Sequence, residues 1–170
     1  TVHIPARKNE SRSLYDAKVT EELARNNVEL IICIGWMRIF SKEFTDRWKD
    51  CCMNVHPSLL PEFAGGMDMN VHQLVIDSEK TETGCTIHMV TDKLDGGPII
   101  IQRKCAVLST DDASTLKARV QQLEGEAFIE AILMWKNADI GPMKGLGWYS
   151  IKTDTRRNIS YKDTGVDIDA

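Results

Sequence analysis

The chain of 170 residues has no hydrophobic run long enough to cross a membrane. Its longest apolar stretch, Leu30 to Met37, is interrupted by a glycine, whereas a transmembrane helix needs about 18 or more apolar residues. An excess of positive charge is also lacking, because 21 Lys and Arg residues are outnumbered by 25 Asp and Glu residues, for a net charge of −4. This balance argues against a nucleic acid or an anionic membrane as the main partner.

Metal-binding and redox cysteine motifs are lacking as well, since no two cysteines form a C-x-x-C pair. An odd count of 5 without framework spacing predicts reduced thiols in a reducing compartment. We therefore expect a cytoplasmic location, or an organelle where a transit peptide has been removed. The 4 histidines show no ligand spacing with those thiols, so we expect no zinc site and no other metal.

The remaining composition, with 42% hydrophobic and 27% charged residues, is typical of one globular domain. The apolar run at 29–34 is typical of a parallel strand buried on both faces. Four-residue spacing predicts a helix from Ser13 to about Asn26, and the longest helix begins near Thr110. This alternation predicts an α/β fold, a mostly parallel sheet flanked by helices, with ligands at the carboxyl ends of its strands.

Asn54 and His56 lie two residues apart at the end of a predicted strand, which Pro57 stops. Strand alternation places both side chains on the same face. An amide there can donate a hydrogen bond to a developing oxyanion, and an imidazole can move a proton near neutral pH. On the spacing alone, a structural amide and a structural histidine are the favoured interpretation.

Asp95 precedes two glycines in the segment 93–98. Glycines allow a sharp turn and a close approach of the backbone to a ligand, and a carboxylate beside an imidazolium favours its charged form. An ordinary Asp-Gly turn between two strands is the alternative. Gln121 and Glu124 are neighbours on one face of the longest helix, where a solvated face is the alternative to a binding role.

The combination of these motifs resembles the folate-dependent formyltransferases. Asn54 to Pro61 (NVHPSLLP) is similar to the signature of that family. Leu94 to Pro98 (LDGGP) follows at a matching distance, with Gly84 to His88 (GCTIH) between them. The resemblance runs from about Val2 to Trp135. It implies a Rossmann-like formyltransferase domain over residues 1–140 that lacks its amino-terminal βαβ portion, followed by a weakly structured extension at 141–170.

The resemblance also implies an activity, the transfer of a formyl group from the co-substrate 10-formyltetrahydrofolate to the amine of glycinamide ribonucleotide in purine biosynthesis. By position, His56 resembles the general acid, Asn54 the oxyanion donor and Asp95 the carboxylate that orients His56. The predicted folate contacts are Arg12, Met37, Arg38, Ile39, Phe40, Asn54, Thr91, Asp92, Lys93, Leu94 and Asp95. The predicted ribonucleotide contacts are Gln121, Gln122, Leu123 and Glu124. Partners are then small molecules, with a homodimer as a possible assembly.

Two other activities stay open on the sequence. A formyltetrahydrofolate deformylase uses a similar Asn, His and Asp to direct water at the formyl group, although the run from Pro57 to Pro61 favours the transferase. A silent fragment that only binds folate is the second, because the Gly-Ser-Asn loop with which the family holds the substrate phosphate is not in this chain. The loop at 64–70 is longer than in bacterial members, which leaves its contacts open.

Overall fold

The computed structural model describes residues 1–66, 69–137, 142–143 and 147–148. Its elements in chain order are α1 (Arg12–Arg25), β1 (Ile31–Cys33), α2 (Lys42–Arg47), β2 (Cys52–His56), α3 (Met69–Asp77), β3 (Glu82–Met89), β4 (Ile99–Ala106), α4 (Ala113–Lys136), β5 (Pro142–Met143) and β6 (Gly147–Trp148). The last two strands pair with each other, and the rest of the extension expected at 141–170 lies outside the described residues. Within the described part of the chain, no helix has both the length and the apolar character that a membrane span requires.

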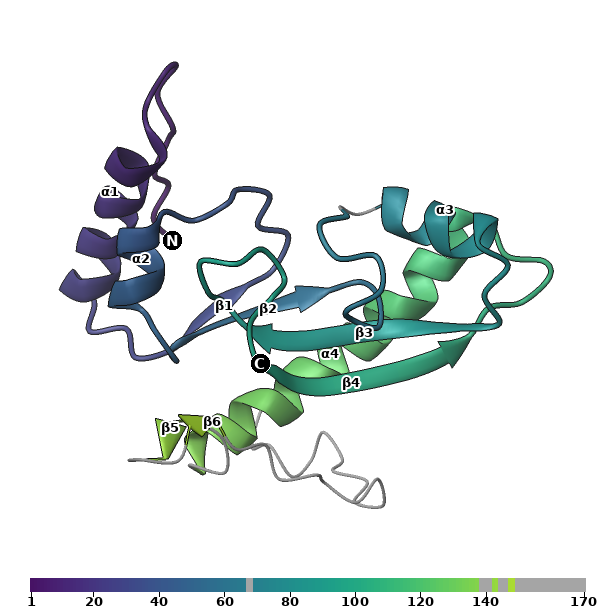
Figure 1. The fold of residues 1–170 in the computed structure, drawn as a ribbon. Helices are drawn as coiled ribbons and strands as arrows, with labels where there is room; N and C mark the ends of the chain where they lie inside the picture. Colours follow the sequence, from purple (N-terminus) through teal and green to yellow (C-terminus); the bar gives the residue numbers. More distant parts are fainter. Residues whose placement is uncertain (67–68, 138–141, 144–146, 149–170) are drawn as a thin grey trace.

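The main sheet has the strand order β1-β2-β3-β4 (Figure 1). Strand β1 pairs in parallel with β2, whereas β2–β3 and β3–β4 are antiparallel. The expectation of a mostly parallel sheet is therefore wrong for the described strands. A parallel pair needs a crossover of about a dozen residues or more, but the loop at 90–98 joins β3 directly to β4. Helix α3 lies beyond the end of β2, so the chain re-enters the sheet in the opposite direction (Figure 1).

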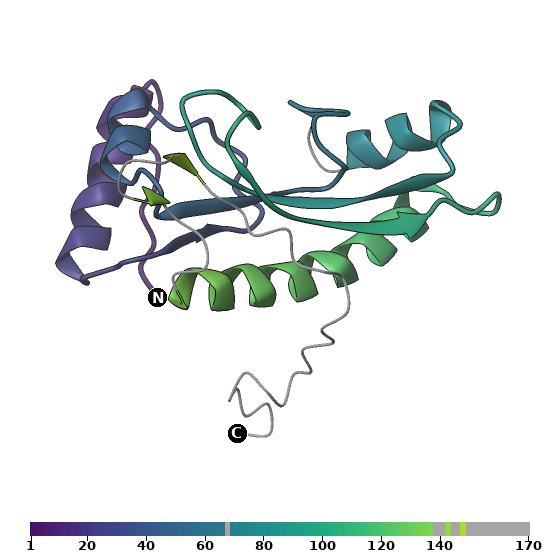
Figure 2. The same cartoon turned by 60° about the horizontal axis from the view of Figure 1, so that its bottom comes forward.

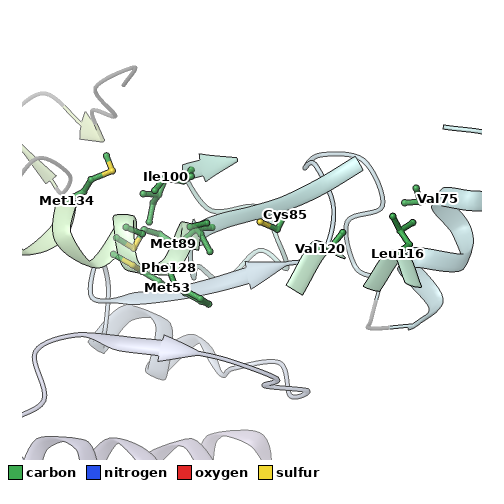
Figure 3. Packing of buried hydrophobic residues seen from close by; sticks show 13 residues of the cluster. Met53, Val75, Cys85, Met89, Ile100, Leu116, Val120, Phe128 and Met134 are labelled. Carbon is green, nitrogen blue, oxygen red and sulfur yellow. The ribbon is translucent and has the colours of Figure 1, made fainter. Parts of the chain in front are cut away.

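Helix α4 runs along one face of this sheet (Figures 1 and 2). It begins at a capping box in which Asp112 and Thr115 exchange side-chain hydrogen bonds with each other's backbone. The strand side chains beneath it include Met53 and Met89, which join Val120 and other α4 residues in the main core cluster (Figure 3). Burial of each such side chain contributes about 1.5–3 kcal/mol to folding.

The opposite side of the sheet packs on α1 and α2 next to β1. Cys33 and Cys52 form a second cluster with Phe44 and Trp48 of α2. Both helices begin at a serine cap, and the buried Asp16 of α1 accepts a hydrogen bond from the backbone N–H of Ser41, the cap of α2. Helices thus flank the sheet on both sides, which confirms the predicted α/β formyltransferase fold.

The register between β2 and β3 decides where the polar side chains gather. Asn54 lies opposite His88, and His56 lies opposite Thr86. Strand alternation sends Met53 and Val55 towards the α4 side of the sheet and these four polar residues towards the other side. The sheet therefore presents a polar patch at the carboxyl end of β2.

Candidate active site

A cavity of about 730 Å³ opens over this polar patch. Its volume lies in the range of about 300–1,000 Å³ that is usual for small-molecule sites. The walls come from the ends of β2 and β3, from the loops that follow β1, β2 and β3, from His72 of α3 and from one face of α4. This location agrees with the general rule that ligands of α/β proteins bind at the carboxyl ends of strands.

The three predicted catalytic side chains, Asn54, His56 and Asp95, line this cavity. Asp95 lies next to His56 and also near a further histidine, His88, which contacts Asn54. The Nδ1 atom of His56 lies 3.3 Å from Oδ2 of Asp95. Nδ2 of Asn54 lies 3.2 Å from Nε2 of His88, and that Nε2 atom is 3.6 Å from Oδ1 of Asp95. The amide, the imidazole and the carboxylate expected from the sequence are therefore neighbours in space.

The backbone of the loop at 90–98 is shaped to bring Asp95 into this position. Asp95 has φ of 51°, a left-handed conformation that costs a residue other than glycine about 1–2 kcal/mol. A side chain on Gly97 would place its Cβ 1.8 Å from the carbonyl oxygen of Met89, so only glycine fits there. The backbone N–H of Gly65 donates to Oδ2 of Asp95 over 2.7 Å. The carboxylate thus connects the two loops that border the cavity.

Both ring nitrogens of His56 face hydrogen-bond acceptors. Nε2 lies 3.0 Å from the carbonyl oxygen of Phe63, and Nδ1 faces the carboxylate of Asp95. A neutral ring can donate at only one of these nitrogens, whereas an imidazolium, the form that can give up a proton, can donate at both. The side chains of His56 and Asp95 are only 4% and 8% exposed, so water screens their charges weakly.

A buried hydroxyl fixes the chain immediately after His56. Oγ1 of Thr86 donates to the carbonyl oxygen of Ser58 and accepts from the N–H of Leu60. The Gln102 side chain donates to both the Leu60 carbonyl oxygen and the Thr86 hydroxyl. These bonds hold the loop against β3 and β4, which keeps the imidazole at a fixed place.

The loop after β1 forms an aromatic and apolar wall. Trp36 stacks on Phe40 with ring centroids 4.8 Å apart, and the Arg38 guanidinium lies 4.2 Å above the centre of the Tyr15 ring. The predicted folate contacts that line the cavity are Met37, Arg38, Ile39, Phe40, Asn54, Thr91, Asp92, Lys93, Leu94 and Asp95. Arg12 is exposed in the first turn of α1 and does not line the cavity.

Helix α4 supplies the wall on the other side. Gln121 and Glu124 line the cavity together with Lys117, which was not among the predicted contacts. These positions share one helix face by their spacing. Gln122 is exposed and Leu123 packs against the core, so neither of these two predicted ribonucleotide contacts lines the cavity.

His88, His72 and Trp36 also line the cavity without having been predicted. Burial lowers the pKa of His88, while the nearby carboxylate of Asp95 acts in the opposite direction. The signal for His88 was its place in a strand, but only the antiparallel register reveals that it faces Asn54. Among the described residues, no group of three or more His, Cys, Asp or Glu is arranged to hold a metal ion.

Comparison with known proteins gives a consistent result. Residues 1–132 match the family model described as formyl transferase. The trifunctional purine biosynthetic protein adenosine-3 of Gallus gallus is 41% identical over 122 residues, which are 72% of this chain and 12% of that protein. The phosphoribosylglycinamide formyltransferase of Escherichia coli K12 is 34% identical over 126 residues, 74% of this chain and 58% of that enzyme.

Solved structures show the same likeness. The phosphoribosylglycinamide formyltransferase of Coxiella burnetii, solved with CHES, has a TM-score of 0.75 and 30% identity, and the match covers 82% of this chain and 64% of that one. A formyltetrahydrofolate deformylase from Pseudomonas syringae has a TM-score of 0.76, covering 88% and 49%, but at 19% identity it shares the fold alone.

The chain thus spans little more than half of the bacterial enzyme and about an eighth of the trifunctional one. The family model nevertheless covers well over half of the chain, including both loops that hold the His56–Asp95 pair. The chain belongs to the formyl transferase family.

Proposed function

We propose that this chain carries the formyl-transfer site of a phosphoribosylglycinamide formyltransferase. The observation that carries the proposal is the convergence of Asn54, His56 and Asp95 in one cavity. The formyl donor would be 10-formyltetrahydrofolate and the acceptor the amine of glycinamide ribonucleotide. Relatives bearing the name of this enzyme are 34% identical to the chain, which supports this activity over other members of the family.

The chemistry assigns one task to each side chain. When the amine attacks the formyl carbon, the C=O electron pair moves to oxygen, and the amide N–H of Asn54 can donate to that oxyanion. Collapse of the intermediate breaks the bond to the folate nitrogen, which takes a proton from the imidazolium of His56. The ammonium formed by the attack gives its extra proton to the neutral imidazole of His56, which restores the imidazolium. Asp95 holds the His56 ring in place throughout.

The two walls of the cavity suit the two substrates. The stacked rings of Trp36 and Phe40 and the exposed apolar side chains of Met37, Ile39 and Leu94 favour a flat heteroaromatic ring, as in a folate. Gln121 and Glu124 on α4 offer a hydrogen-bonding amide and a carboxylate to a polar acceptor with an amine. We place the donor against the loop after β1 and the acceptor against α4.

Further parts of the proposal follow from the family and the sequence. We propose domain bounds of about 1–140, since the family match ends at residue 132. We also propose a cytoplasmic location and small-molecule partners only, with a homodimer left to direct measurement. Arg12, Gln122 and Leu123 stay as predicted contacts that would need a rearrangement of the described cavity to reach a ligand.

The test is a formyl-transfer assay that follows the folate product with and without glycinamide ribonucleotide. We expect product only when the ribonucleotide is present, and a loss of roughly 100-fold or more in His56→Ala, in line with the general acid's usual contribution of about 10²–10⁴. Production of formate without the ribonucleotide would show a deformylase. Folate binding without turnover, both with and without acceptor, would show a silent module.

A further inference from the structure

His88 is a buried histidine for which the proposed chemistry has no task. It lies on β3 directly opposite Asn54, is 3% exposed and lines the cavity. Its ring contacts three polar groups, the carbonyl oxygen of Met89, the amide of Asn54 and the carboxylate of Asp95. Such a network is costly to bury unless every donor meets an acceptor.

The contacts determine which nitrogen of His88 carries the proton. Nδ1 lies 3.0 Å from the carbonyl oxygen of Met89, which can only accept, so Nδ1 donates. Burial disfavours a second proton on the ring, so Nε2 keeps its lone pair and can accept from Nδ2 of Asn54, which lies 3.2 Å away. Oδ1 of Asp95 at 3.6 Å is beyond hydrogen-bond distance from Nε2. The ring is therefore neutral, with its proton on Nδ1.

We propose that His88 is a positioning residue, whose unprotonated Nε2 holds the Asn54 amide with its NH₂ group towards the reaction centre. The inference rests on the proposed function, because it assigns the amide of Asn54 to the oxyanion. An amide turned by 180° would place its oxygen against the Nε2 lone pair, two acceptors in contact. His88 thus excludes the orientation in which Asn54 would repel an oxyanion. The second hydrogen of the same nitrogen stays available to the substrate.

Burial works in the same direction as the hydrogen bonds. Loss of hydration disfavours the charged ring and lowers the pKa of His88, although Asp95 opposes this effect. A positive charge on the neighbouring ring of His56 adds to the lowering of the His88 pKa. Asp95 therefore faces two histidines with different tasks, a charged ring at His56 and a neutral ring at His88.

The first test is the ¹⁵N spectrum of the histidine rings in the purified wild-type protein at pH 7. We expect the His88 signals of a neutral ring with the proton on Nδ1. A proton on Nε2, or an imidazolium, would overturn the proposal. The spectrum requires no turnover, so it decides the state of His88 even where the formyl-transfer assay refutes the proposed function.

The second test is a double-mutant cycle between His88 and Asn54. His88→Met removes the hydrogen-bond acceptor and keeps a side chain of similar size. We expect kcat to fall roughly 10- to 100-fold, a smaller loss than deletion of an oxyanion donor causes. KM should change less than about threefold. His88→Gln can offer an oxygen to the Asn54 N–H and should recover much of the loss. In an Asn54→Ala background, His88→Met should cost less than about threefold. The same loss in both backgrounds would show that His88 is only structural.

Discussion

Replacement of Asp95 by asparagine isolates the charge of the carboxylate from its shape. The Asn oxygen can still accept from the N–H of Gly65, which in the wild type donates over 2.7 Å. We therefore expect Asp95→Asn to stay folded, with the circular dichroism spectrum of the wild type. What the variant loses is the negative charge 3.3 Å from the His56 ring.

The size of the effect follows from that distance. Two unit charges 3.3 Å apart attract by about 5 kcal/mol at an effective dielectric constant of about 20. Only the part of this attraction that acts in the transition state lowers kcat. A loss of about 2.7–4 kcal/mol there corresponds to roughly 100- to 1,000-fold, and this is the range we predict for Asp95→Asn.

The assay is the steady-state rate of formyl transfer at saturating donor and acceptor. Asp46→Asn is a matched control, because it removes a carboxylate that pairs with Lys42 at the surface of α2, where such a pair contributes about 0–1 kcal/mol. We expect the control to keep its rate within about twofold. A folded Asp95→Asn protein with nearly the wild-type kcat would refute the role of the carboxylate.

Three further predictions concern stability, each read from chemical denaturation. Gly97→Ala should lower the free energy of unfolding by at least about 2 kcal/mol, because its Cβ would meet the Met89 carbonyl oxygen; an unchanged midpoint would contradict this. Gly125→Ala, with open space around the new Cβ, should instead raise it by about 0.5–1 kcal/mol, and a loss would show an unseen clash. A hydrogen bond from Arg119 holds the pKa of Asp111 at about 2, below its ordinary 3.8, so this stabilisation is complete above about pH 4 and is lost towards about pH 2. The unfolding free energy of the wild type should therefore fall more steeply over that window than that of Asp111→Asn, and equal slopes would contradict the ion pair.

The sequence predicts local features of this fold better than the direction of its strands. Local patterns locate the helices to within a few residues: the start expected at Ser13 lies two residues after the observed cap Ser11, and the start expected near Thr110 lies two residues before the cap Asp112. The direction of β3 depends on where α3 takes the chain after β2, which is a tertiary effect. An apolar run fits a buried strand of either direction, and this ambiguity led to the wrong expectation of a mostly parallel sheet.

The same distinction applies to the cavity. Asn54 and His56 were found because two residues on one strand share a face whatever the rest of the fold does. Asp95 was predicted from its glycine turn and from the family resemblance. Its short distance to His56 could be seen only in the structure. His88 faces Asn54 only through the register of two separate strands, which no spacing in the sequence reveals.

Helix α4 gives a third example. Periodicity places Gln121 and Glu124 on one face of the helix and predicts Lys117 on it equally well, but it does not say which face borders a cavity. Gln122 and Leu123 were predicted as contacts because the family resemblance covers 121–124 as one continuous segment. Consecutive helical residues point in different directions, so a continuous segment could not line one wall.

The central claim is that this site moves a formyl carbon from a folate nitrogen to an amine. It is tested most directly by following a ¹³C-labelled formyl group of 10-formyltetrahydrofolate by NMR in the presence of the protein and glycinamide ribonucleotide. The account predicts that the label appears as the formamide of the ribonucleotide, and that His56→Ala slows its appearance at least about 100-fold. Label that ends in formate, or that stays on the folate, would contradict it.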